Sequence, residues 1–321
     1  MRPSLNRRPA RMRSLPWHIT LVLVLGAGVF ALTATLLWAA LGFPALTGPH
    51  ALAAGTKFDL VKLALSVVAG VGGVLALVVA YRRQRLSEAA ERREDIRLFN
   101  ERFITASSQL GHELPTVRLA GIYAMAGLAD DWAEGRQSCV NVLSAYLRMP
   151  YEPVSTSPWY LDEEGEIRLS LTRLITEHLR EDAPVSWQGC DFDFTRARFQ
   201  AADFSGACFS GGEVSFSLVR FDGGRISFDG ARFSGSRVRF GGTAFLGGQV
   251  SFADACFSEG RVTFDGAVFT GAAVSFRGAR FTGAELDLSS VEPENYAVPP
   301  EFDPWDTPPA GLLLPRPRTS G

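Results

Sequence analysis

The sequence of 321 residues predicts a mixed fold with three parts: a two-span transmembrane helical hairpin, a small α-helical cytoplasmic module and a β-solenoid. Two long uncharged apolar runs near the N-terminus predict the hairpin. Apolar residues at helical spacing after these runs predict the helical module. A phenylalanine that recurs at fixed intervals over the last third of the chain predicts the solenoid.

These patterns also place the boundaries along the chain. We expect a basic cytoplasmic tail over 1–18, transmembrane helix 1 over 19–43, an external loop over 44–58, transmembrane helix 2 over 59–81, the helical module over 82–188, the solenoid over 190–288 and a Pro-rich tail over 289–321.

The first apolar run is uncharged from Ile19 to Phe43, which exceeds the ~20 residues that a helix needs to cross a bilayer. It is also too long for the apolar region of a cleaved signal peptide. Arginines lie before the first run and directly after the second, whereas the connecting loop has only Lys57. The positive-inside rule therefore predicts a multi-pass protein of the cell inner (plasma) membrane with both termini in the cytoplasm.

The segment after the second run reads as amphipathic helices. Stretches beginning at Pro115, near Arg136 and at Ile167 form three further helices, with HEAT-like packing as one option. His112 and His178 are the only histidines here, and neither has a Cys, Ser or acidic partner at a spacing that builds a site. We expect His178 to act as a packing residue near a helix C-terminus.

Cysteines and charge indicate no metal or nucleic-acid site. The four cysteines form no CxxC pair and no Cys/His cluster, so we expect free thiols. Cys208 and Cys256 fall in the same phase of the repeat and should face the same side of the solenoid. The formal net charge of −2 gives no general electrostatic reason for nucleic-acid binding.

Phenylalanine punctuates the solenoid region from Phe194 to Phe281. The gaps begin as three fives and then alternate between seven and five, so the period settles at twelve. The residue two before each ring is usually small or β-branched, as with Val250 before Phe252, and both should point inward because alternate side chains of a strand share a face. We assign these side chains to the structural core of the solenoid: Phe204, Phe209, Phe216, Phe221, Phe228, Phe233, Phe240, Phe245, Phe252, Phe257, Phe264, Phe269, Phe276 and Phe281.

The motifs Ala202-Asp-Phe204 and Ala207-Cys-Phe209 resemble the pentapeptide-repeat family, and the later F-x-x-A-x-F units resemble its variant with two extra residues at alternate corners. The resemblance implies a right-handed quadrilateral β-helix. Together with the flanking helical stretches, the chain is similar to membrane-associated pentapeptide-repeat proteins of actinobacterial type. Coil size stays open between four faces with 24 residues, which we prefer, and two faces with 12.

Three functions are compatible with this pattern. We favour a membrane-anchored, non-enzymatic scaffold or protein-interaction module that displays the solenoid in the cytoplasm. Some relatives in the family mimic DNA and inhibit a topoisomerase, but residues 190–288 hold eleven acidic residues and ten arginines, which is far from a strongly negative surface. The third alternative is a membrane-linked enzyme with an unrecognised site.

No residue is assigned to catalysis, to a cofactor or to a metal, because no nucleophile, metal or phosphate-binding motif is present. The expected partners are the lipid bilayer and a cytoplasmic protein, with a homo-oligomer as a further option. Nucleic acid is not expected as a partner. The Pro-rich tail either caps the last coil through Tyr296, Phe302 and Trp305 or remains a disordered linker.

Overall fold

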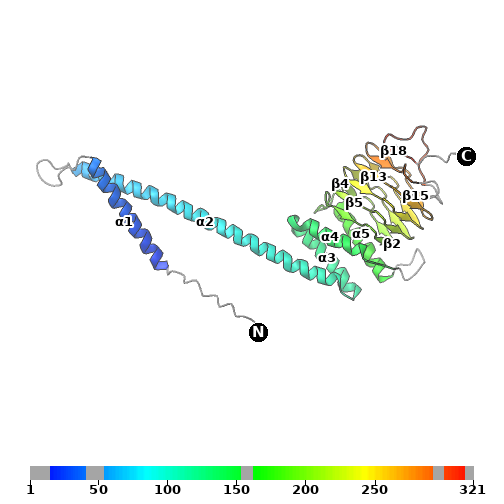
Figure 1. Ribbon diagram of the computed structural model, residues 1–321, viewed down its shortest axis with the longest axis horizontal. Helices are drawn as coiled ribbons and strands as arrows, with labels where there is room; N and C mark the ends of the chain where they lie inside the picture. The colour runs from blue at the N-terminus through cyan, green and yellow to red at the C-terminus, as the bar shows by residue number, and fades with distance from the viewer. Residues whose placement is uncertain (1–14, 41–53, 153–161, 292–299, 315–321) are drawn as a thin grey trace. The chain divides into compact units, whose positions relative to one another are not determined.

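The computed structural model describes the backbone of residues 15–40, 54–152, 162–291 and 300–314 (Figure 1). It divides into two compact units, residues 1–95 and 96–321, and each is described by itself. Most of the expected N-terminal tail and external loop, Tyr296 and the end of the Pro-rich tail lie outside the described residues.

The first unit contains α1 (Leu15–Ala40) and the N-terminal part of α2 (Ala54–Leu110). Among the residues described, α2 is the one helix long and apolar enough to cross a membrane, from Val61 onward. In α1 the described apolar stretch, 24–40, is shorter. The two-span hairpin therefore stays a prediction.

The charged part of α2 is supported along its surface by pairs four residues apart. Gln84 donates to Glu88 at 3.1 Å, and Arg97 pairs with Glu101 at 3.0 Å. Such pairs add a few tenths of a kcal/mol each to a helix. They explain why this polar sequence continues the apolar helix without a break.

The second unit begins with the end of α2 and continues through α3 (Pro115–Asp131), the 3-10 turn η1 (Ala133–Gly135), α4 (Arg136–Arg148) and α5 (Glu163–Leu179). Pro115 occupies the first turn of α3, where its missing N–H costs nothing. Asp162 caps α5 by accepting the Gly165 N–H at 2.8 Å, and three glutamates follow in the first turn, where the helix dipole favours them.

The solenoid consists of short parallel strands in four sheets, here called A to D. Sheet A holds β1 (Phe192–Asp193), β5 (Glu213–Ser215), β9 (Arg237–Arg239), β13 (Arg261–Thr263), β17 (Glu285–Asp287) and β18 (Leu312–Leu313). Sheet B holds β2 (Arg198–Phe199), β6 (Arg220–Phe221), β10 (Ala244–Phe245) and β14 (Val268–Phe269). Sheet C holds β3 (Ala202–Asp203), β7 (Arg225–Ser227), β11 (Gln249–Ser251) and β15 (Ala273–Ser275). Sheet D holds β4 (Cys208–Ser210), β8 (Arg232–Ser234), β12 (Cys256–Phe257) and β16 (Arg280–Phe281).

The chain visits the four sheets in turn, so each coil has four sides. Val214 pairs with Val238, and Val238 with Val262, which makes a coil of 24 residues and confirms the preferred coil size. Phe192 pairs with Val214, only 22 residues on, because the corner between Phe199 and Phe204 has the five-residue spacing. The result is a right-handed β-solenoid of about five turns.

Phenylalanine rings stack in columns inside the solenoid. Phe240 lies 4.9 Å from Phe216 and 4.7 Å from Phe264, centroid to centroid, with ring planes 5° apart in both pairs. A ring of one coil thus covers the ring of the next, and the neighbouring coils complete a core that no coil could bury alone.

Helices cover the first coil of the solenoid. The α5 side chain Thr176 donates to the Asp203 carbonyl at 2.8 Å, and the α4 side chain Gln137 donates to the Asp191 carbonyl at 2.8 Å. Trp187, between α5 and β1, is fully buried. These contacts satisfy the backbone at the end of the solenoid that would otherwise expose open strands.

The tail covers the last coil. Phe302 stacks on Phe276 at 4.8 Å, and Trp305 contacts Phe281 edge to face at 6.1 Å. Leu312 of β18 pairs with Leu286 of β17 and adds one more strand to sheet A. The described part of the Pro-rich segment is therefore a cap and not a free linker.

Candidate interaction surface

The phenylalanines predicted as core point into the solenoid. All from Phe204 to Phe276 are at most 2% exposed, and the last one, Phe281, is half-buried beneath the tail. Their stacked rings occupy the interior of the solenoid, which leaves its outer faces and the helical module as surfaces for binding.

Outward side chains on sheets A and C mostly serve the turns that follow them. On sheet C, the hydroxyls of Ser227, Ser251 and Ser275 each accept the backbone N–H two residues later, at 3.2 to 3.4 Å. Asp193 and Asp203 make the same bond with their carboxylates. This turn chemistry explains why Ser or Asp so often precedes the phenylalanine there.

Sheets B and D carry different outward residues at the equivalent position. Sheet D alternates Cys208, Arg232, Cys256 and Arg280 in direct register. The two cysteines share one face, as predicted, and Arg232 lies between them. All four cysteines of the chain are free, and burial raises the pKa of the Cys139 thiol to about 11, which suits a packing role.

Seven of the ten arginines of residues 190–288 form ion pairs, three of them with an acid on a neighbouring coil. Arg261 pairs with Glu285 at 2.7 Å across β13 and β17, and Arg239 pairs with Glu213 across β9 and β5. Arg148 of α4 reaches Asp193. Burial by itself would raise the pKa of Asp193, but hydrogen bonds from Thr195 and the nearby arginine charges hold it below its usual range.

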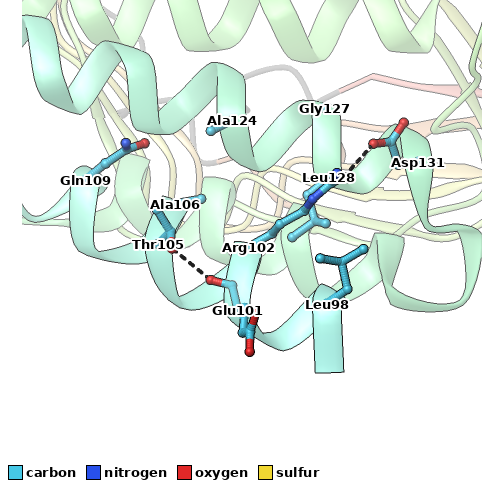
Figure 2. A pocket seen from close by; sticks show the side chains of 10 residues that line it. All are labelled: Leu98, Glu101, Arg102, Thr105, Ala106, Gln109, Ala124, Gly127, Leu128 and Asp131. Carbon is cyan, nitrogen blue, oxygen red and sulfur yellow. Dashed lines mark hydrogen bonds and ion pairs between the residues drawn. The ribbon is translucent and has the colours of Figure 1, made fainter. Parts of the chain in front are cut away.

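A shallow groove of about 440 Å³ lies between the end of α2 and α3 in the second unit (Figure 2). On the α3 side, Ala124 and Gly127 contribute almost no side chain, and this leaves space for the groove. Arg102 and Asp131 form an ion pair of 3.1 Å at one end of the groove, and both are exposed. The side chains that line this groove do not form a set of catalytic groups, so we do not assign it a catalytic role.

His178 has an acidic partner that its sequence neighbours do not reveal. Its Nε2 lies 3.0 Å from Asp130 Oδ2, and its Nδ1 lies 2.7 Å from the Leu174 carbonyl. Asp130 also accepts the Trp187 indole N–H at 2.8 Å, and the His178 ring stacks on Trp187. We expected His178 to lack an acidic partner, and this was wrong, because α3 supplies Asp130 from 48 residues away. His178 also packs against Trp187, in keeping with the expected packing role.

A second polar network joins α3, α4 and α5. Arg168 is almost fully buried, bonds the Leu147 and Met149 carbonyls, and pairs with Glu164 at 3.1 Å. Glu164 also pairs with Arg118 at 2.9 Å. Burial and the neighbouring Glu164 raise the pKa of Tyr146, which accepts a bond from Arg118, to about 12. The network is closed and structural, because its members satisfy one another.

No cluster of three or more His, Cys, Asp or Glu side chains suited to a metal ion occurs within the described ranges.

The family model of pentapeptide repeats (8 copies) matches residues 188–211. The chain carries pentapeptide repeats. The match ends where the five-residue spacing gives way to alternating five and seven, although the pentapeptide-repeat solenoid continues to β17. No curated protein and no solved structure matches the chain.

Proposed function

We propose that the chain is a membrane-anchored scaffold that offers a cytoplasmic pentapeptide-repeat solenoid to a protein partner. The observation that carries the proposal is that both ends of the solenoid are covered, by α4 and α5 at one end and by the tail at the other. Open ends would pair strands with further copies. Covered ends leave the side faces as the surface available to a partner.

Membrane anchoring is supported by the first unit. Between Val61 and Tyr81 the apolar side chains of α2 are exposed almost throughout, with Ala64 as the buried exception. An apolar surface of this extent is unfavourable in water and favourable in a bilayer. The arginines that follow directly, Arg82, Arg83 and Arg85, suit a cytoplasmic flank.

This proposal includes the multi-pass topology in the plasma membrane, with both termini in the cytoplasm, and the likeness to membrane-associated actinobacterial-type proteins of the family. The topology is tested by a cytoplasm-dependent reporter and a periplasm-dependent reporter, each fused after Gly321. Activity of the cytoplasm-dependent fusion alone is the expected result. Activity of the other fusion alone would refute the topology.

The scaffold function is tested by proximity labelling with the labelling enzyme fused to the full-length chain. The expected result is a reproducible set of cytoplasmic proteins that is absent when the fusion carries only residues 1–95. An identical set from both fusions would refute a partner for the solenoid unit. A topoisomerase within the set, with inhibition of supercoiling by the chain, would instead favour DNA mimicry.

A further inference from the structure

A second groove lies where α5 meets sheet C. One wall is α5 with Leu169 and Arg173. The other is formed by β3, the turn that follows it and β7, with Asp203, Ser205 and Arg225. The groove encloses about 340 Å³. We call it the α5 groove. It forms because α5 packs on β3 of the first coil, and the strand of the next coil continues beside it.

The two arginines of the α5 groove are held loosely. Arg173 lies 3.9 Å from Asp203, and Arg225 lies 3.4 Å from Asp229, with both arginine side chains more than half exposed. Arg261, by comparison, is 2.7 Å from Glu285. Long, exposed ion pairs contribute little to stability, so these guanidinium groups can exchange their present acids for a ligand's acid at little cost.

Two serine hydroxyls also line the groove. The Ser205 hydroxyl donates to the Ser227 hydroxyl at 2.7 Å, and Ser227 is buried. Leu169 and Ala202 add an apolar wall. Two guanidinium forks beside hydroxyls and aliphatic groups fit a carboxylate, which arginine can bind through two parallel hydrogen bonds.

The charge around the groove decides which carboxylate-bearing partner fits. Only two arginines line the groove, with Asp203 and Asp229 beside them, which is too few cations for the series of phosphate contacts that a nucleic acid or an anionic membrane requires. A protein segment gains from single, well-placed carboxylates and from its own apolar side chains against Leu169. We propose that the α5 groove binds an extended acidic segment of the protein partner. This inference rests on the proposed scaffold function.

The test uses the full-length chain in nanodiscs of zwitterionic lipid and a fluorescein-labelled octapeptide of alternating glutamate and leucine as the probe. Fluorescence anisotropy should show saturable binding. The double variant Arg173→Gln/Arg225→Gln should weaken it by about tenfold or more, because two charge-assisted contacts are lost. A peptide with lysine in place of glutamate should not bind.

The matched control is Arg220→Gln/Arg261→Gln, which removes the same charge from sheets B and A. Unchanged melting temperatures confirm that both double variants fold. Equal weakening by the two pairs, or no binding to the wild type, would overturn the proposal. So would anionic vesicles binding through Arg173 and Arg225 while the peptide does not. If proximity labelling finds partners that the groove variant retains in full, the groove fails and the scaffold function survives.

Discussion

The solenoid and the helical module that precedes it in the sequence bury different kinds of side chains. The solenoid interior is apolar and repetitive: one ring per strand, stacked on the ring of the next coil, as Phe228 is on Phe252 at 4.8 Å. The helical module instead buries the charged Arg168 and places the partly buried Asp130 between His178 and Trp187. Because the solenoid core repeats one contact, its inward positions are interchangeable but all require the same residue type. In the polar network each position requires a particular residue with particular partners.

The strongest challenge to this contrast is a charge inside the repetitive core. Phe252→Asp places an unpaired carboxylate between Phe228 and Phe276, and we expect it to destabilise the solenoid by about 5 kcal/mol or more. Thermal melting of the detergent-solubilised chain, followed by circular dichroism, measures the effect. Thr270→Asp, on an exposed corner, adds the same charge and should melt like the wild type. Equal melting of the two variants would refute a stacked core.

A slightly smaller effect is expected when the polar core loses its charge. Arg168→Met removes one of the two arginines that pair with Glu164 and leaves the Leu147 and Met149 carbonyls without their guanidinium donor, at a cost of about 3–5 kcal/mol. Hydrogen exchange of the amides of α4 and α5 measures the loss locally. The matched change Arg97→Met removes an exposed arginine and should cost about 1 kcal/mol or less. Similar losses in the two variants would mean that the network does not hold the module.

The smallest expected effect distinguishes two reasons for glycine at the corners of the solenoid: a positive φ and the close approach of the preceding coil. Gly248 has a φ of +72°, and a Cβ there would lie 2.3 Å from the Gly224 carbonyl oxygen of the coil before. Gly230 has a similar φ of +66° with open space around it. Gly230→Ala should therefore cost about 1 kcal/mol from backbone strain alone, and Gly248→Ala about 1–2 kcal/mol more from the overlap.

Denaturant unfolding of both glycine variants gives the comparison directly. A common loss for both would show that the backbone conformation, and not the close packing of coils, requires glycine at the seven-residue corners. A much larger loss at Gly230 would contradict the geometry of both corners.

Much of the solenoid could be predicted from the sequence because its physics is local and repeated. The spacing of phenylalanine specified the inward positions, the small residue before each ring and the common face of Cys208 and Cys256. The 24-residue coil was one of two options, since a period of twelve fits either two or four sides. Only the pairing of Val214 with Val238 decided between them.

The candidate surfaces were not predictable in the same way. Asp130 meets His178 across 48 residues, and Arg173 of α5 meets Arg225 of β7 across a groove that exists only when the helix lies on sheet C. No periodicity in the sequence predicts these contacts between distant residues. The sequence by itself determined the repeat, the inward phenylalanines and the apolar helix, because each follows from a period or a run. Tertiary structure alone decided the capped ends, the buried charge networks and the α5 groove, because these depend on how separate elements pack.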